Sequence, residues 1–146
     1  MIKILFICHG NICRSPMAEF IFKKMVKDAG LEKDYVIASA ATSREEIGND
    51  IYPPAKRELT KRGVPFERRG ARQVTREEYK DWDMFICMDE QNVRNIMRIF
   101  GSDPEKKVSM LLDRSVADPW YTDNFGAAFD DIYRGCIRLF SYKQHT

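Results

Sequence analysis

Residues 4–16 are Ile4-Leu5-Phe6-Ile7-Cys8-His9-Gly10-Asn11-Ile12-Cys13-Arg14-Ser15-Pro16, and this stretch decides the fold of the chain. The four apolar residues at its start are typical of a buried strand. Gly10-Asn11 permits the backbone conformations that a tight loop needs, and Pro16 suits the first turn of a helix. The stretch therefore predicts a strand, then a loop, then the beginning of a helix.

The predicted loop has the properties of an anion-binding site. Its backbone N–H groups have no partners within a strand or a helix, and the helix that follows adds positive potential. Cys8 opens the loop and Arg14 lies six positions later, where a tight loop can turn both side chains toward one centre. Together these features predict a loop that holds a phosphoryl group.

The residue types in this loop favour attack on phosphorus. A cysteine beside an arginine at the start of a helix is expected to exist largely as a thiolate, which is a nucleophile. The planar guanidinium of Arg14 can bind two phosphoryl oxygens and stabilise the charge that develops on them. Ser15 can donate a hydrogen bond to the Cys8 sulfur and help it to leave later. The combined spacing disfavours the alternative, in which Cys8 and Cys13 are only small buried residues at the end of a core strand.

The loop resembles that of the low-molecular-weight protein tyrosine phosphatases, which reads Cys-x5-Arg-Ser with a second cysteine inside it. Unrelated phosphatase folds share Cys-x5-Arg alone, but here an Asp-Pro pair follows about a hundred residues later, an order specific to this family. The resemblance covers nearly the whole chain and continues through Ser39–Ser43, Glu46–Asn49, Ala71–Thr75, Cys87–Glu90 and Asp118-Pro119.

The resemblance implies hydrolysis of phosphotyrosine in proteins through a phosphocysteine intermediate. Cys8 would be the nucleophile, Arg14 the phosphate clamp, and Asp118 the general acid and then the base that activates water. Asn11 and Ser39 would form a hydrogen-bond network that supports the loop. The residues expected to bind substrate are His9, Gly10, Asn11, Ile12, Cys13, Ser15, Trp120 and Tyr121.

Asp118 is the candidate proton donor because a phenolate leaves phosphorus poorly at neutral pH unless it is protonated. Pro119 disfavours a helix at this point, so we expect Asp118 on an extended, exposed loop. Trp120 and Tyr121 follow directly and predict the walls of a slot whose depth suits the flat ring of phosphotyrosine. The alternatives are a simple turn at Asp118-Pro119 and packing roles for the two aromatic residues.

Three positions depart from the pattern of the family. Trp120 stands where many members have tyrosine, and Glu45 stands at a variable position that often holds an aromatic residue on the opposite wall. Both are expected to alter peptide preference. Relatives also carry a histidine near Arg68 and Arg69 that joins the network around the loop asparagine. An arginine can substitute for it, but we expect both arginines to be exposed charges, which leaves this member of the network open.

Apolar runs and helical patterns alternate along the chain, which predicts an α/β fold. We expect a three-layer sandwich with a central parallel sheet of about four strands and helices on both faces, in one phosphatase domain spanning residues 1–146. The Cys8 loop and the loop that carries Asp118 would then meet at the carboxyl edge of the sheet. The expected strands lie at 4–7, 35–38, 84–88 and 108–112, and the main helices at 16–29, 55–62, 90–100 and 125–140. Gly30, Gly63 and Gly101 are expected to end the first three of these helices, and Asp89 is expected to cap the third.

The composition excludes several classes of function. A net charge of +2 is too small to indicate a nucleic-acid partner, and no apolar run is long enough to predict a membrane span. Since no secretory segment is evident, the four cysteines predict free thiols in a reducing cytoplasm. Without a Cys-x2-Cys pair, and with only two histidines, we expect no metal and no cofactor. The expected partners are a phosphotyrosine-containing protein or peptide and, as inhibitors, phosphate, vanadate and similar oxyanions.

Other functions remain open at this point. Arsenate reduction uses a similar loop but needs a closely spaced downstream cysteine pair, whereas Cys87 and Cys136 are far apart. A protein arginine phosphatase tends to carry threonine at the position of Ile12. A phosphate-binding module without turnover would lack the thiol or the acid. Cys13 also has two interpretations, as a redox partner that condenses with oxidised Cys8 or as a packing residue beneath the loop.

Overall fold

The computed structural model describes residues 1–144 and contains a parallel sheet of four strands in the order β2-β1-β3-β4. Strand β1 (Ile2–Cys8) lies at the centre and pairs with β2 (Tyr35–Ala41) on one side and with β3 (Met84–Cys87) on the other. Strand β4 (Val108–Met110) pairs with β3 and forms an edge. The predicted parallel sheet is confirmed.

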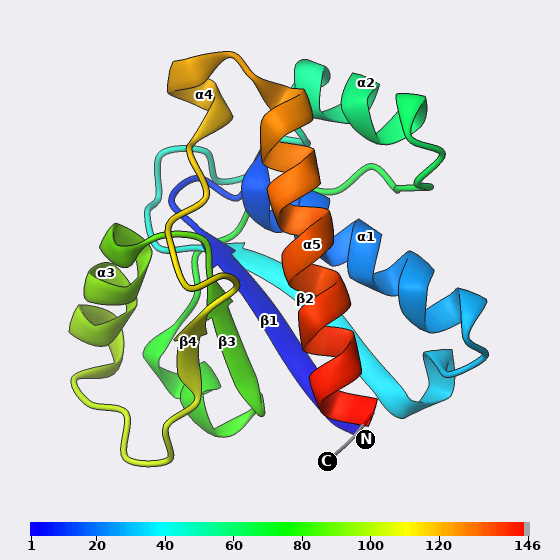
Figure 1. Ribbon diagram of the computed structural model, residues 1–146. Helices are drawn as coiled ribbons and strands as arrows, with labels where there is room; N and C mark the ends of the chain where they lie inside the picture. The colour runs from blue at the N-terminus through cyan, green and yellow to red at the C-terminus, as the bar shows by residue number, and fades with distance from the viewer. Residues whose placement is uncertain (145–146) are drawn as a thin grey trace.

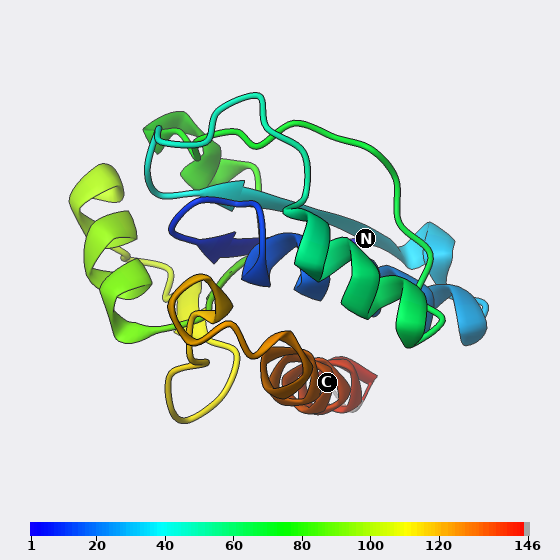
Figure 2. The same ribbon diagram turned by 90° about the horizontal axis from the view of Figure 1, so that it is seen from above.

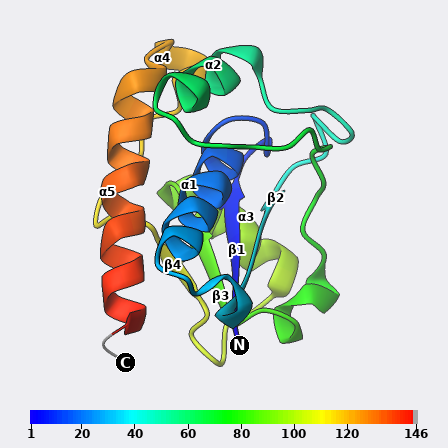
Figure 3. The same ribbon diagram turned by 90° about the vertical axis from the view of Figure 1, so that its right-hand side faces the viewer.

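Helices cover both faces of this sheet, as Figures 1 and 3 show. Helices α1 (Arg14–Asp28) and α5 (Phe125–Gln144) pack together on one face, and α3 (Glu90–Phe100) lies on the other. The predicted three-layer α/β architecture is therefore confirmed. The remaining helices are η1 (Glu32–Asp34), α2 (Pro53–Lys61), η2 (Arg76–Lys80) and α4 (Pro119–Thr122).

The central strand shows why its sequence is apolar throughout. Ile4 and Phe6 belong to the core between the sheet and helices α1 and α5, whereas Leu5 and Ile7 belong to the core on the α3 side. All four side chains are fully buried. A strand covered on both faces buries the side chains of successive residues in one core or the other. This explains why its sequence is continuously apolar and does not alternate between apolar and polar residues.

Residues with special backbone properties end the helices where the sequence indicates. Gly30, Gly63 and Gly101 follow α1, α2 and α3, and each has a positive φ that other residues adopt at a cost. The carboxylate of Asp89 accepts the backbone N–H of Asn92 and caps α3. Strand β4 ends two residues before the predicted end at residue 112, because Leu111 and Leu112 turn into the core.

The order of the strands places the functional loops at one edge of the sheet. The chain leaves β1, forms β2 on one side, and then crosses to β3 on the other side. The loop after β1, the loop after β2 and helix α4 gather at this edge, as Figure 2 shows from above. Among residues 1–144, no helix combines the length and the apolar character that crossing a bilayer requires.

Candidate active site

The loop after β1 wraps around the sulfur of Cys8. The backbone N–H groups of Asn11 and Ser15 donate to Sγ over 3.3 and 3.4 Å, and Ser15 Oγ lies 3.0 Å from it. Asn11 has a φ of 61°, in the left-handed region, which lets the loop turn back tightly on itself. Donors directed at the sulfur favour its negatively charged form, which is the nucleophilic one.

Arg14 lies buried beside this loop with only 2% of its surface exposed. Its guanidinium donates to Asp89 Oδ2 over 2.7 Å, to the carbonyl of Val116 over 2.9 Å and to Asp118 Oδ2 over 3.3 Å. Burial alone would lower the pKa of Arg14, but the negative charges of Cys8, Asp118 and Asp89 outweigh burial and raise it. Arg14 is therefore a fixed cation at the base of the site.

Asp89 is a partner of Arg14 that the sequence did not assign. The helical pattern predicted Asp89 only as the cap of α3, and its Oδ1 does accept the N–H of Asn92 over 2.7 Å. Its Oδ2 faces Arg14, so that one carboxylate both caps a helix and orients the guanidinium. The Cys87–Glu90 motif was the only indication in the sequence that this residue belongs to the site.

We predicted Asp118 on an extended, exposed loop without a helix, and this prediction is wrong. A short helix, α4, begins at Pro119, and Asp118 caps it by accepting the N–H of Trp120 over 3.0 Å. Proline fits the first helical position because the N–H that it lacks has no partner there. Asp118 itself is extended, and its side chain is only 25% exposed because its second oxygen faces Arg14.

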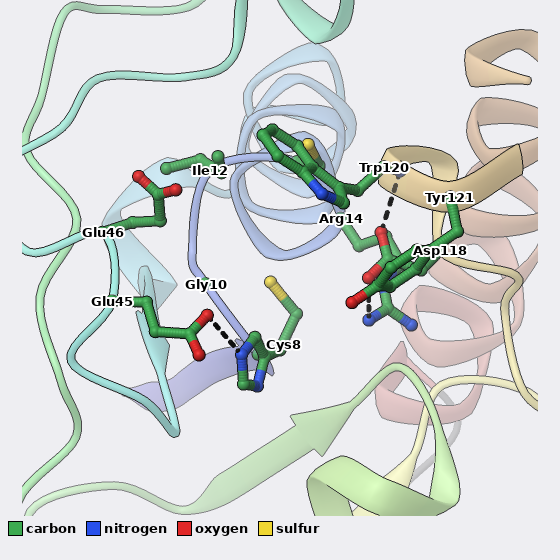
Figure 4. A pocket seen from close by; sticks show the side chains of 11 residues that line it. Cys8, Gly10, Ile12, Arg14, Glu45, Glu46, Asp118, Trp120 and Tyr121 are labelled. Carbon is green, nitrogen blue, oxygen red and sulfur yellow. Dashed lines mark hydrogen bonds and ion pairs between the residues drawn. The ribbon is translucent and has the colours of Figure 1, made fainter. Parts of the chain in front are cut away.

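Figure 4 shows the pocket that these residues form. Trp120 and Tyr121 border one side, near Asp118, while Glu45 and Glu46 lie on the opposite side. The pocket has a volume of about 120 Å³ and is lined by nine of the predicted residues, namely Cys8, His9, Gly10, Ile12, Cys13, Arg14, Asp118, Trp120 and Tyr121.

The two sides of the pocket differ in chemical character, since one is aromatic and the other acidic. Trp120 is half exposed, and its ring packs on that of Tyr52 with 4.8 Å between centroids. Tyr121 is 82% exposed. On the acidic side, the ring nitrogen Nε2 of His9 lies 2.8 Å from a carboxylate oxygen of Glu45. His9 therefore has a specific partner at the rim.

Asn11 and Ser39 form the expected network beneath the pocket. The amide of Asn11 donates to Ser15 Oγ over 2.8 Å and to Ser39 Oγ over 2.9 Å. Ser39 then donates to Glu19 over 2.6 Å. The side-chain oxygen Oδ1 of Asn11 accepts the backbone N–H of Arg72 over 3.3 Å. The side chains of Asn11, Ser15 and Ser39 thus support the loop from below and do not line the pocket.

Comparison with known proteins identifies the family. The family model described as low molecular weight phosphotyrosine protein phosphatase matches residues 3–145. The chain belongs to this family. Low molecular weight protein-tyrosine-phosphatases are hydrolases, and the resemblance inferred from the loop and the Asp-Pro pair is confirmed.

Relatives from distant organisms share most of the chain. The low molecular weight phosphotyrosine protein phosphatase of Homo sapiens is 36% identical over 93% of this chain and 89% of its own length. YfkJ, the low molecular weight protein-tyrosine-phosphatase of Bacillus subtilis, is 36% identical, and its crystal structure superposes with a TM-score of 0.95 over 99% of this chain and 96% of that one. A protein tyrosine phosphatase of Entamoeba histolytica, solved with Hepes in its active site, is 26% identical with a TM-score of 0.92, covering 99% and 98% of the two chains.

Arg69 corrects one expectation about how this phosphatase departs from its family. We expected Arg68 and Arg69 to be exposed charges, and only Arg68 is exposed. Arg69 is half-buried: one terminal nitrogen, Nη2, donates to the carbonyl of Asn11, and the other, Nη1, donates to that of Asn49 over 3.2 Å. The prediction is wrong for Arg69 because the buried carbonyl of Asn11 needs a hydrogen-bond partner, and the guanidinium of Arg69 points inward and donates to it.

Cys13 is buried at the start of α1, with 5% of its surface exposed. Burial raises the pKa of Cys13 to about 12, and the neighbouring Cys8 and Asp118 act in the same direction. Cys13 therefore remains a thiol at neutral pH. This form packs well in an apolar environment and reacts slowly with other sulfur species.

Peroxide treatment tests the redox interpretation of Cys13. Cys8 sulfenic acid can condense with the Cys13 thiol, forming one disulfide and releasing one water. If Cys13 is the resolving thiol, peroxide-inactivated enzyme should regain activity with dithiothreitol, mass spectrometry should show the Cys8–Cys13 bond, and added phosphate should protect. Cys13→Ser should turn over substrate but lose most of this recovery. Equal recovery in the mutant would assign Cys13 to packing alone.

Proposed function

We propose that the protein hydrolyses phosphotyrosine in other proteins through a covalent phosphocysteine at Cys8. The observation that supports this most strongly is the convergence of two backbone N–H donors and the Ser15 hydroxyl on the Cys8 sulfur, in a pocket that also contains Arg14 and Asp118. The relative from Entamoeba histolytica holds Hepes, a sulfonate, in its active site, which is consistent with a pocket for tetrahedral anions.

In the first step, Cys8 Sγ attacks phosphorus, the S–P bond forms and the bond from phosphorus to the tyrosine oxygen breaks. Asp118 in its protonated form donates its proton to that oxygen, so that neutral tyrosine leaves. Arg14 and the N–H groups of the loop stabilise the charge on the phosphoryl oxygens. Asp89 and the carbonyl of Val116 hold the guanidinium in place during this step.

In the second step, Asp118 as carboxylate takes a proton from water, the new O–P bond forms, and the P–S bond breaks. Cys8 leaves as a thiolate and phosphate is released. Ser15 Oγ, 3.0 Å from the sulfur, is placed to donate to the thiolate as it leaves. Atoms and charge balance over the two steps without a metal ion or other cofactor.

The walls of the pocket support a preference for phosphotyrosine. Trp120 and Tyr121 offer aromatic surface to a phenyl ring, whereas the shorter side chain of phosphoserine would leave that surface unused. Ile12 lines the pocket at the position where arginine phosphatases tend to carry threonine, which disfavours phosphoarginine. Cys87 and Cys136 are fully buried in β3 and α5, which disfavours the thiol relay that arsenate reduction requires. Free, buried cysteines also fit our proposal that the enzyme works in the cytoplasm.

Turnover of para-nitrophenyl phosphate tests this proposal. We expect turnover that is unchanged by EDTA, and faster turnover of phosphotyrosine peptides than of the same peptides with phosphoserine or phosphoarginine. Cys8→Ser serves as the control for contaminating phosphatases. A requirement for a divalent metal, or faster turnover of phosphoarginine, would contradict the proposed function.

A further inference from the structure

The orientation of the peptide groups in the loop decides how well it binds an anion. The carbonyl of His9 accepts the N–H of Ser43 over 3.1 Å, and the carbonyl of Ile12 accepts the N–H of Tyr52 over 2.9 Å. Both partners lie outside the loop. Because residues 1–144 contain no cis peptide bond, each N–H points opposite to the carbonyl before it, and so toward the centre of the loop. When a carbonyl of the loop points away from its centre, the N–H of the following residue therefore points toward the centre and can donate to an anion.

Asn11 has the same arrangement, but its carbonyl has a charged partner. Its backbone N–H, its amide and its side-chain oxygen are all paired within the network around Cys8. Its carbonyl accepts a hydrogen bond from the guanidinium of Arg69, and Asn11 is only 1% exposed. Removing Arg69 would leave the buried carbonyl of Asn11 without this partner, in a residue whose own φ is 61°.

Arg69 also joins two parts of the site. Its guanidinium binds the carbonyls of Asn11 in the loop and of Asn49, near the end of the segment that carries Glu45 and Glu46. Its backbone N–H donates to Asp50 over 3.1 Å, which fixes the start of the side chain. The anion loop and the acidic side of the pocket are therefore held to the same cation.

The charge of Arg69 acts on Cys8. Burial lowers the pKa of Arg69, while the nearby Glu19, Cys8 and Asp50 act to raise it, and a guanidinium stays charged at any physiological pH. Arg69 is therefore a fixed positive charge near Cys8. The other ionisable groups around Cys8 are Arg14, Cys13, Cys87, Glu46, Asp89, Asp118 and the His9–Glu45 pair.

We propose that Arg69 is a positioning residue of this active site, which turns the Ile12 N–H toward the bound anion and places a fixed positive charge near Cys8. The proposal rests on the proposed function, because it assigns Arg69 to the same phosphate loop. It acts through Asn11 and does not touch the substrate.

Three variants separate the parts of this proposal. Arg69→Met replaces the guanidinium with an uncharged side chain of similar size that donates no hydrogen bond. Arg69→Lys keeps the positive charge but loses the planar guanidinium that binds two carbonyls. Arg68→Met makes the same change at an exposed neighbouring residue and is the matched control. The readouts are the affinity for inorganic phosphate by calorimetry, kcat/KM for a phosphotyrosine peptide, the pH dependence of Cys8 alkylation by iodoacetate, and the melting temperature.

We expect Arg69→Met to lower phosphate affinity and kcat/KM by roughly tenfold to a hundredfold, because a displaced loop donor misplaces the phosphoryl group. The midpoint of the alkylation profile should move to higher pH, since the positive charge of Arg69 near Cys8 is lost. Arg69→Lys should restore the alkylation midpoint and only part of the phosphate affinity. Arg68→Met should match the wild type in all readouts.

The outcomes distinguish this proposal from the proposed function. Phosphate binding and alkylation do not depend on turnover, so a wild type that failed to hydrolyse phosphotyrosine would still allow both to be compared. Unchanged phosphate affinity and alkylation in Arg69→Met would overturn the proposal. If Arg69→Met does not fold, Arg69→Lys decides: wild-type phosphate affinity in this variant would contradict a role for the two-carbonyl contact.

Discussion

Cys8→Ser is expected to reduce turnover to the background level while leaving phosphate binding in place. The serine hydroxyl is not ionised at neutral pH, so the variant lacks the nucleophile of the first step. The other backbone N–H groups of the loop and the guanidinium of Arg14 come from residues other than Cys8, so they remain available to an anion. Steady-state assays with para-nitrophenyl phosphate and calorimetry with inorganic phosphate measure the two effects separately.

A second cysteine provides the control for this experiment. Cys136 is fully buried in α5, within the core that α5 forms with α1. Cys136→Ala removes a thiol of the same chain without touching the pocket and should turn over substrate like the wild type. Activity above a few per cent in Cys8→Ser would remove Cys8 from the role of nucleophile.

Asp118→Asn is expected to lower the rate by roughly two to four decades for substrates whose leaving group has a high pKa, which is the usual range for general acid catalysis. Asparagine also caps helices well, so α4 and the walls of the pocket should keep their places. A leaving group such as nitrophenolate needs little protonation and should lose less. A series of aryl phosphates of increasing leaving-group pKa measures this dependence.

Asp123→Asn is the matched control for the Asp118 series. Asp123 is exposed, follows α4 directly and has a φ of 59°, a conformation that asparagine accepts readily. This variant makes the same chemical change five residues away and should leave all rates unchanged. An identical loss for phenyl and nitrophenyl esters in Asp118→Asn would show that Asp118 does not protonate the leaving group.

The sequence predicted those parts of the fold that depend on local patterns. The apolar run at residues 4–7, the glycines after the helices and the cap at Asp89 each act over a few residues, and the structure contains all of them. The prediction of an extended loop without a helix after Asp118 was wrong, because proline is compatible with both a helix start and an extended loop, and the local sequence does not separate the two.

The partners of the loop were harder to predict because they come from distant parts of the chain. Asp89 reaches Arg14 from 75 positions away, and Arg69 reaches Asn11 from 58 positions away. The pattern of apolar residues along the sequence does not predict such contacts, because they form only when the strands assemble into the sheet. Glu19 was overlooked although an acidic residue lies there among buried neighbours in α1, and in retrospect that position indicates a buried polar partner.

The phosphocysteine is the central claim, and trapping it is the most direct test. Wild-type enzyme mixed with para-nitrophenyl phosphate and quenched in acid within the first turnovers should carry one phosphoryl group, which peptide mass spectrometry locates on Cys8. In Asp118→Ala the group should accumulate, since water is no longer activated for the second step. A phosphoryl group on another residue, or none on the enzyme during rapid turnover, would contradict this account.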